Sequence, residues 1–427
     1  MRPYKVLRDP VHGDIGIPRE LLRLCDTPEF QRLRGIKMLG TASLVYPGAT
    51  HTRFEHSLGT CHLTQTLLDK IGEPPDLAVL AAALLHDVTH IPFGHTIEDE
   101  RRVFARHDSP ERIRNFLPRG ELGKVLKELA LLEPVLDILS GPSGPAWRQQ
   151  IFSGTVCADL LDYIARDSYY CGLSQRYDSR ILSSFGLDAS GDIYLNAFKS
   201  GLVRHDVVSE VIHLLRIRYF LSERVYFHHT KTASGAMISR AVEEAIHQGL
   251  TLEDLERLGD ETLLYCLHQN YTKNPIVATL MEHLRGHHIY KQTYVITRQV
   301  GEERRQKLVQ RYHLSPTERA AAERELTRNL KLKEGQLIIY CPALRMQLKE
   351  ADVKVKVDEG PPRLLSALGL PELETLKERH QDLWKLYVFT DPDLESKALK
   401  VAQACEKYFG EANHLPALRG GQLYFQF

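Results

Sequence analysis

The sequence of 427 residues contains no apolar run of membrane-spanning length, which argues against a chain that crosses a bilayer as helices. An excess of one charge sign is also missing, because 55 basic side chains balance 55 acidic ones and the formal net charge is zero. No strong electrostatic footprint for nucleic acid follows, although a local basic groove would leave that partner open. The N-terminal stretch lacks the apolar segment of a signal peptide, so we expect a cytoplasmic protein with no membrane partner.

Cysteine is scarce and has no paired spacing. The seven cysteines form no C-x-x-C motif, and their odd number suggests reduced, structural thiols in a cytosolic compartment. Internal repeats and low-complexity segments are missing as well. What remains is a chain that is ample for a large core and long for one compact domain.

Histidine, in contrast, is abundant. The chain has 20 histidines, and many fall between residues 51 and 107. Residues 80–95 read L-A-A-A-L-L-H-D-V-T-H-I-P-F-G-H, in which small apolar residues run directly into His86 and Asp87. Histidine offers a neutral nitrogen ligand and aspartate an anionic oxygen, so the pair suits a catalytic divalent metal. The alternative is a helix end at which both side chains only form a cap or an ion pair.

Two further segments carry candidate ligands. His56 lies upstream in H-T-R-F-E-H-S, and Asp159 lies downstream in A-D-L-L-D-Y-I-A-R-D. The order His56, His86-Asp87, Asp159 is the ligand order of HD-domain phosphohydrolases. The set contains no sulfur, which argues against a structural zinc, whereas nitrogen and carboxylate ligands suit Mn, Mg, Fe, Ni or Zn in a catalytic role. The sequence does not choose among these metals.

Six motifs extend the similarity along the chain: Lys5-Val6, Asp9–Gly13, Asp26–Arg34, Tyr46–Ala49, Arg53–Gly59 and Asp162–Asp167. With them, the chain resembles the HD-domain dNTP triphosphohydrolases, especially the branch of the metazoan SAM-and-HD-domain dNTPase and its bacterial relatives. The resemblance is strong from Tyr4 to about Ala245 and weak beyond. It implies a metal-dependent enzyme that hydrolyses dNTPs to a deoxynucleoside and inorganic triphosphate.

The resemblance also implies roles for residues around the metal. The candidates for proton transfer are His90, His95 and His107, with His95 as the general acid, although some of them could instead orient the metal ligands. The resemblance implies six substrate-binding residues, Arg53, Leu39, Tyr163, Asp167, Arg218 and Tyr226. The two arginines are expected to bind the triphosphate, and the other four to surround the sugar and base.

Three positions weaken the match at the substrate. Met38 stands where the metazoan enzyme has a glutamine at the sugar, and Leu160 stands where it has a lysine on the triphosphate. Lys231 does not clearly match the family pattern. A solvated helix face is the alternative interpretation of Lys231, so we leave it outside the predicted site.

Family members are often regulated by nucleotides bound between subunits. One set of residues matches a guanine-reading activator pocket, and a second set matches parts of a neighbouring dNTP-activator pocket: Lys5, Asp26, Gln31 and Arg34, then Val45, Arg204, Arg224 and His228. Four positions depart from the second pocket, namely Arg8, Asp206, Glu210 and His229. Two of these are acids, which repel a phosphate. The resemblance implies dNTP substrates, GTP or dNTP activators, and a homo-oligomer that is a tetramer or a dimer.

The predicted fold is mainly α, with an HD-domain helical core over residues 1–285 and a smaller C-terminal α+β region over residues 286–427, packed on the core. Helices are expected at residues 56–71, 75–87, 98–117, 159–171 and 202–249, after two short strands within residues 5–17. The C-terminal region is expected to hold strands at residues 290–296, 337–341, 353–357 and 386–389, and a closing helix at residues 394–408.

Two other functions stay open at this stage. The same ligands could serve a phosphohydrolase of broader specificity that acts on other nucleotides or phosphoesters. The chain could also be a nucleotide-sensing or nucleic-acid-binding protein in which the HD site is vestigial. The intact ligand set argues against the second alternative.

Overall fold

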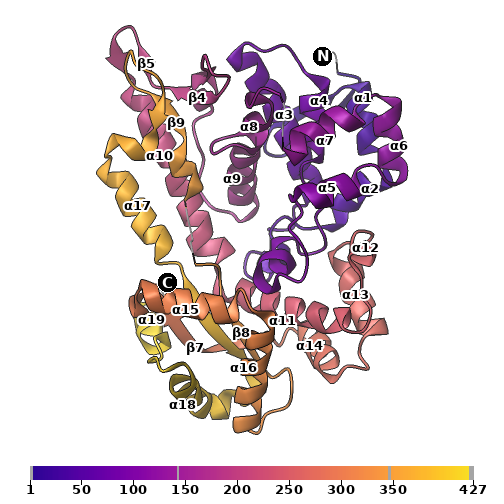
Figure 1. The fold of residues 1–427 in the computed structure, drawn as a ribbon, viewed down its shortest axis with the longest axis vertical. Coiled ribbons are helices and arrows are strands. Elements are labelled where there is room, and N and C mark those ends of the chain that lie inside the picture. Colours follow the sequence, from indigo (N-terminus) through magenta and orange to yellow (C-terminus); the bar gives the residue numbers. More distant parts are fainter. Residues whose placement is uncertain (1–2, 142–143, 345–347, 423–427) are drawn as a thin grey trace.

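The computed structural model describes residues 3–141, 144–344 and 348–422. The predicted fold is confirmed: a mainly helical core carries a smaller C-terminal α+β region (Figure 1). The boundary predicted between residues 285 and 286 stays a prediction, and residues 1–2 and 423–427 of the two regions lie outside the described chain. Within the described residues, none of the helices has the length and apolar character that a bilayer crossing requires.

The α-helices are numbered α1 to α19 in chain order. Their bounds are α1 (Arg19–Cys25), α2 (Pro28–Gln31), α3 (Arg53–Ile71), α4 (Leu77–Leu85), α5 (Pro110–Phe116), α6 (Gly120–Glu128), α7 (Leu132–Ser140), α8 (Trp147–Ser153), α9 (Ala158–Tyr170), α10 (His205–Leu221), α11 (His229–Ile246), α12 (Leu252–Leu255), α13 (Asp260–Asn270), α14 (Pro275–Arg285), α15 (Glu302–Tyr312), α16 (Pro316–Asn329), α17 (Pro371–Gln381), α18 (Ala398–Phe409) and α19 (Leu415–Gln422).

The strands form four small sheets, with bounds β1 (Lys5–Asp9), β2 (Gly13–Ile17), β3 (Phe185–Leu187), β4 (Ile193–Asn196), β5 (Phe198–Lys199), β6 (Leu202–Val203), β7 (Lys291–Thr297), β8 (Leu337–Tyr340), β9 (Lys354–Lys356), β10 (Arg363–Leu364) and β11 (Lys385–Thr390). The sheet orders are β1-β2, β10-β9-β4-β3, β7-β11-β8 and β5-β6. Strand β9 pairs in parallel with β4, with Leu195 opposite Val355. A C-terminal segment therefore joins a sheet that begins in the first half of the chain.

The charged tract predicted as one helix over residues 98–117 is interrupted, and that prediction is wrong. The chain forms a π-helix, η3 (Thr96–Arg101), then an irregular segment, and then α5. Arg102 takes the left-handed conformation with φ 54°, which stops η3. Ser109 accepts a hydrogen bond from the backbone of Arg112 and precedes Pro110 at the first helical position, so α5 starts anew there.

Buried charges fix η3 against the second half of the molecule. Arg101 of η3 pairs with Glu243 of α11 at 2.9 Å and with Glu323 of α16 at 2.8 Å. Arg319 of α16 adds a contact of 3.1 Å to Glu243. Glu323 also accepts the backbone N–H of Ile339 in β8 at 2.9 Å. These contacts hold η3, α11 and the end of β8 in a fixed relation, and all three border the cavity described next.

Candidate metal centre and substrate cavity

The four predicted metal ligands come from three helix ends that the fold brings together. A capping box of Thr52 and Glu55 starts α3, which places His56 in the first turn. Helix α4 begins at the Asp76 cap and ends at His86, so His86 and Asp87 leave its C-terminal end. Asp159 lies in the first turn of α9. Because α3 packs along both α4 and α9, the three ends converge.

The ligand atoms lie within reach of one cation. His56 Nε2 is 3.0 Å from Asp159 Oδ1 and 3.8 Å from Asp87 Oδ2. His86 Nε2 is 3.5 Å from Asp87 Oδ1 and 3.8 Å from Asp159 Oδ1. The ligand atoms of His56, His86 and Asp159 all lie within 4.8 Å of one another. The predicted set is thus assembled in space.

The hydrogen bonds of the two histidines fit a metal. His56 Nδ1 meets Asp162 at 2.7 Å, and His86 Nδ1 meets the Ala83 carbonyl at 2.8 Å. Within the described chain, Nε2 of each ring is buried and has no hydrogen-bond partner. A buried polar atom without a partner is costly, and a metal ligand whose other nitrogen is held by a carboxylate or carbonyl is the usual arrangement. The residues therefore suit a divalent cation.

The local charges favour a cation as well. Burial raises the pKa of Asp87, but Arg53, His86 and His90 outweigh it and hold that pKa well below its ordinary value. Burial lowers the pKa of His56, yet its close contacts with the carboxylates of Asp159 and Asp162 prevail and raise it to about 10. The carboxylates around His56 thus stabilise a positive charge at this point, whether a proton or a metal ion supplies it.

Asp162 is a functional residue that the sequence analysis missed. It is fully buried, accepts hydrogen bonds from Arg166, and meets His12 at 2.6 Å and His56 at 2.7 Å. Its position three residues after Asp159 on α9 puts both carboxylates on one helix face, which the spacing alone could have shown. Asp162 is therefore placed to orient His56, a predicted metal ligand, rather than to bind the metal itself.

We predict that Asp162→Asn lowers the free energy of unfolding by about 3 kcal/mol at neutral pH, because Arg166 loses a buried counter-charge. Burial opposes ionisation of Asp162, but Arg166, His12 and His56 keep its pKa well below the ordinary value. The stabilisation is therefore present above the unfolded pKa of about 4 and is lost as pH falls through the folded pKa. Urea unfolding from pH 7 down to pH 3 measures it, and an equal midpoint for both proteins at pH 7 would refute the prediction.

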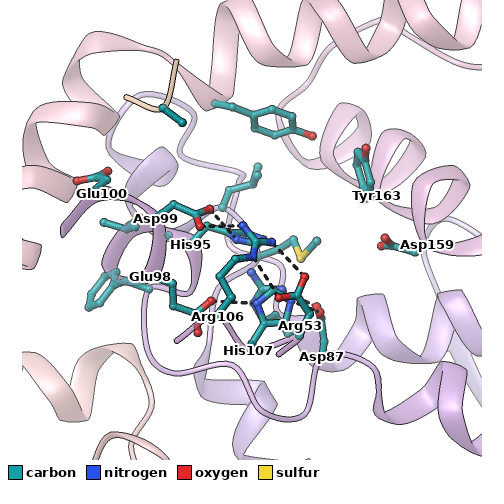
Figure 2. Close-up of a pocket in the computed structure, with 18 of the residues that line it drawn as sticks. Arg53, Asp87, His95, Glu98, Asp99, Glu100, Arg106, His107, Asp159 and Tyr163 are labelled. Carbon is teal, nitrogen blue, oxygen red and sulfur yellow. Dashed lines mark hydrogen bonds and ion pairs between the residues drawn. The ribbon is translucent and has the colours of Figure 1, made fainter. Parts of the chain in front are cut away.

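The three predicted proton-transfer histidines also lie together. The rings of His90 and His107 stack at 3.4 Å, and His95 meets each edge-on at about 5 Å. His90 and His107 are buried, whereas half of the His95 side chain is exposed. His107 Nδ1 meets Glu98 at 2.9 Å, and His95 Nδ1 lies 3.2 Å from Asp99 (Figure 2).

Their environments separate the roles of these histidines. Burial, together with Arg53 and His107, holds the pKa of His90 well below its ordinary value. Burial also lowers the pKa of His107, although Glu98 opposes the change. Both rings are thus favoured in the neutral form, which makes them poor proton donors. His95 borders the cavity, is open to solvent and is paired with an acid, so it is the better candidate for a general acid.

The predicted metal ligands open into a cavity of about 1300 Å³, large enough for a nucleotide. All six residues predicted to bind substrate line it, together with the predicted departure Met38: Arg53, Leu39, Tyr163, Asp167, Arg218 and Tyr226. Leu160, the other predicted departure, is buried in the core beside Asp159. Figure 2 places Arg53 and Asp87 between Asp159 on one side and Glu100 on the other.

Arg53 is buried and donates a hydrogen bond to Asp87, one of the predicted metal ligands. It also lines the cavity. Gly94 makes this possible, because it has φ +46° and a Cβ there would lie 2.8 Å from Arg53 Nη2. The cavity lining includes a second group of contacts. The guanidinium of Arg218 lies 4.9 Å from the ring of Tyr226, whose hydroxyl donates to Asp167 at 2.6 Å.

The position of Lys231 contradicts the interpretation of this residue as part of a solvated helix face. Its side chain lines the cavity, and burial lowers its pKa. Lys231 sits at the start of α11, five residues after Tyr226, and its ammonium donates to the Tyr226 carbonyl at 3.4 Å. One feature of the sequence could have indicated this position. Lys231 follows Tyr226, a predicted substrate-binding residue, by only five residues.

The predicted activator residues lie outside the cavity lining. Gln31 and Arg34 form a hydrogen bond of 2.8 Å, and the guanidinium of Arg34 covers the Phe54 ring. Lys5 and Asp26 are exposed. In the second set, Tyr46, next to Val45, donates to the Arg224 carbonyl, and the ring of His228 lies 6.5 Å from that of Tyr46.

Arg204 belongs to the second set but is paired with Asp206, one of the four positions that depart from the family. Glu210, another departure, accepts the backbone N–H of Asp178 at 2.7 Å. The other two departures behave differently: Arg8 pairs with Asp14, and the ring of His229 stacks on that of His228. Asp206, one of the two acids predicted to weaken phosphate binding, thus already forms an ion pair with an arginine of the second set.

Comparisons with known proteins agree with this arrangement. Residues 53–167 match the HD domain, and residues 202–413 match the HD associated region. An uncharacterized protein of Methanocaldococcus jannaschii is 34% identical over 296 residues, which are 67% of this chain and 59% of the relative. Deoxynucleoside triphosphate triphosphohydrolase SAMHD1 of Mus musculus is 27% identical over 399 residues, 78% of this chain and 60% of the relative. The chain spans somewhat more than half the length of these curated relatives.

Solved structures share the fold over almost the whole chain. A hypothetical protein of Aquifex aeolicus superposes with a TM-score of 0.71 at 23% identity, covering 93% of this chain and 99% of its own. A phosphohydrolase of Bacteroides thetaiotaomicron superposes with a TM-score of 0.67 at 24% identity, covering 91% and 99%. At these identities the two structures support the architecture.

Proposed function

Because this chain is an HD-domain protein that also carries the HD-associated region, we propose that it is a metal-dependent hydrolase of dNTPs. The reaction releases a deoxynucleoside and intact inorganic triphosphate. The observation that supports it best is the pair of buried Nε2 atoms of His56 and His86, which form no hydrogen bond within the described residues and lie 3.0 and 3.8 Å from Asp159 Oδ1 beside a nucleotide-sized cavity. The activity named for the SAMHD1 relatives supports the choice of substrate.

Four side chains, His56, His86, Asp87 and Asp159, would hold the cation, which when bound supplies Lewis acidity that activates water and polarises the α-phosphate. Arg53 and Arg218 bind oxygens of the triphosphate and neutralise the charge that develops during attack. As the bond between the α-phosphorus and the 5′-oxygen breaks, His95 donates a proton to that oxygen. Neutral His90 and His107 pack beside His95 and hold it in place.

The wall that carries Tyr226 binds the nucleoside. Its ring packs on the base, and Asp167 accepts a hydrogen bond from a sugar hydroxyl. Asp167 already meets Tyr226 and His51, at 2.6 and 2.8 Å, but a carboxylate has about four acceptor sites, so it retains capacity for the sugar. Met38 borders the same space without a polar group, so this chain depends on Asp167 for contact with the sugar.

We extend the proposal to regulation. The residues matching an activator pocket lie outside the cavity lining, and several are exposed, as a pocket shared between subunits requires. A homo-oligomer, either a tetramer or a dimer, would complete such pockets with GTP or a dNTP. The pairing of Arg204 with Asp206 favours the guanine-reading set over the second set as the functional one.

Product analysis tests the proposed reaction. The purified protein is incubated with each dNTP and Mn²⁺ or Mg²⁺, singly and in mixtures, and the products are separated by chromatography. We expect deoxynucleoside plus triphosphate, and turnover that appears only in mixtures would show nucleotide activation. Deoxynucleoside monophosphate plus pyrophosphate would contradict the assigned leaving group. Turnover of other phosphoesters alone would favour a broader phosphohydrolase, and no turnover with any of them would favour a sensor.

A further inference from the structure

Two opposite charges border the cavity, and the proposed reaction uses neither. Glu100 belongs to η3 and Lys231 to α11, and both line the cavity. Within the described residues the two side chains do not pair with each other. Glu100 accepts from Ser239 at 3.3 Å, and Lys231 donates to the Tyr226 carbonyl at 3.4 Å. Both bonds are long, so each group keeps hydrogen-bonding capacity.

The fold makes room for the Glu100 carboxylate. Gly235, in the interior of α11, faces it, and a Cβ there would lie 3.0 Å from Glu100 Oε1 and 2.9 Å from Thr96 Cγ2. A glycine inside a helix costs about 1 kcal/mol relative to alanine, so the close approach has a cost in stability. The π-helix that carries Glu100 is a rare conformation that is frequent at functional sites.

The surroundings leave both charges poorly compensated. Burial raises the pKa of Glu100 to about 8, although Lys231 and Arg101 oppose the change. Burial also lowers the pKa of Lys231, which Glu100 and Asp167 oppose. Arg101, next to Glu100, is already paired with Glu243 and Glu323. A ligand that offers donors to Glu100 and an acceptor to Lys231 would therefore stabilise both charged forms.

The position of the pair points to the base of the nucleotide. Lys231 contacts the backbone of Tyr226, whose ring packs on the base in the proposed function. Asp159 and Glu100 lie on opposite sides of the cavity (Figure 2). Leu39 and Gly40 border the same region, since Gly40 lies against Thr96. The edge of a base stacked on Tyr226 is what the pair can reach.

Guanine has the edge that fits. A carboxylate is an acceptor of two parallel donors, and an ammonium donates to a carbonyl oxygen. Guanine presents the N1–H and the 2-amino group side by side, with the O6 carbonyl next to them. Adenine and cytosine offer an amino group beside a ring nitrogen that accepts, and thymine offers one N–H between two carbonyls. Only guanine supplies two adjacent donors to Glu100 and a carbonyl to Lys231.

We propose that Glu100 and Lys231 read the guanine base and make dGTP the preferred substrate of the cavity. The inference rests on the proposed function, because it requires a deoxynucleotide whose triphosphate lies at the metal ligands. It assigns a specificity role to two residues outside the predicted site.

Steady-state kinetics with three substrates tests it. The proteins are wild type, Glu100→Gln, Lys231→Met and the control Glu121→Gln, which changes an exposed acid of α6. The substrates are dGTP, dATP and dITP, the last of which keeps O6 and N1–H but lacks the 2-amino group. We expect wild-type kcat/KM for dGTP to exceed that for dATP about tenfold or more, with dITP between them.

The variants provide the decisive contrast. Glu100→Gln and Lys231→Met should each lower kcat/KM for dGTP about tenfold while changing that for dATP less than about twofold, and the control should change neither. Equal losses for all three substrates, or no loss, would overturn the inference. If no dNTP is hydrolysed, the proposed function fails. Calorimetric titration of wild type and Glu100→Gln with dGTP and dATP then measures whether the cavity still binds guanine more tightly than adenine and whether Glu100 is responsible. Equal affinities in that titration would overturn the inference.

Discussion

Asp159→Ala abolishes hydrolysis and metal binding in our account, with a loss of at least about 10⁴-fold in kcat/KM, because no other group replaces the cation. Asp159 Oδ1 lies nearer to His56 Nε2 than any other carboxylate oxygen of the site. One third of the Asp159 side chain is exposed, so its removal leaves no buried hole and the fold persists. Metal content by mass spectrometry and turnover of dNTPs are measured on the same preparation.

The matched control is Asp69→Ala, which removes an exposed carboxylate near the end of α3, the helix that carries His56. Its metal content, activity and melting temperature should equal those of wild type. Retention of both metal and activity in Asp159→Ala would show that the ligand set is wrong. Loss of activity with full metal content would instead place Asp159 on the substrate, which also contradicts the account.

His95→Asn should lower kcat by about 10²- to 10⁴-fold, since an asparagine cannot donate a proton to the leaving 5′-oxygen. Metal content and KM should change little, because His95 is not one of the four predicted ligands and half of its side chain is exposed. A general acid must be protonated to act, so wild-type kcat should fall at high pH. The variant should lose this fall while keeping the dependence at low pH.

Stability and specificity controls accompany His95→Asn. His247→Asn, an exposed histidine after α11, should leave kcat and its pH profile unchanged. Unchanged high-pH behaviour in His95→Asn would assign proton donation to another group. An increase in KM without loss of kcat would make His95 a substrate-binding residue.

Local patterns in the sequence placed the four predicted metal ligands at helix ends. His56, His86, Asp87 and Asp159 each sit at a helix end that capping residues or a breaker mark, such as Thr52 with Glu55 before His56. Family resemblance then supplied their grouping, and the structure places them within a few ångströms. Strands β7, β8, β9 and β11 also followed from apolar or alternating runs, and they lie close to their predicted positions.

Features that depend on distant contacts were beyond the sequence. Strands β3 to β6 are two to four residues long and interrupt a region predicted as nearly all helical. Strand β4 gains β9 as a parallel partner from 160 residues further on, which no local pattern reveals. The same holds for Glu100 and Lys231, because η3 is held by Arg101 through partners on α11 and α16. A charged run predicted as one continuous helix thus lines part of the cavity.

Hydrolysis in ¹⁸O-labelled water is the most direct test of the central claim, that water attacks the α-phosphorus and the bond to the 5′-oxygen breaks. The products of a single dNTP are separated and weighed by mass spectrometry. The account predicts one ¹⁸O atom in the triphosphate and none in the deoxynucleoside. Label in the deoxynucleoside would mean attack at carbon, and labelled monophosphate or pyrophosphate would mean another scissile bond; either result would contradict the assigned roles of the metal ligands and His95.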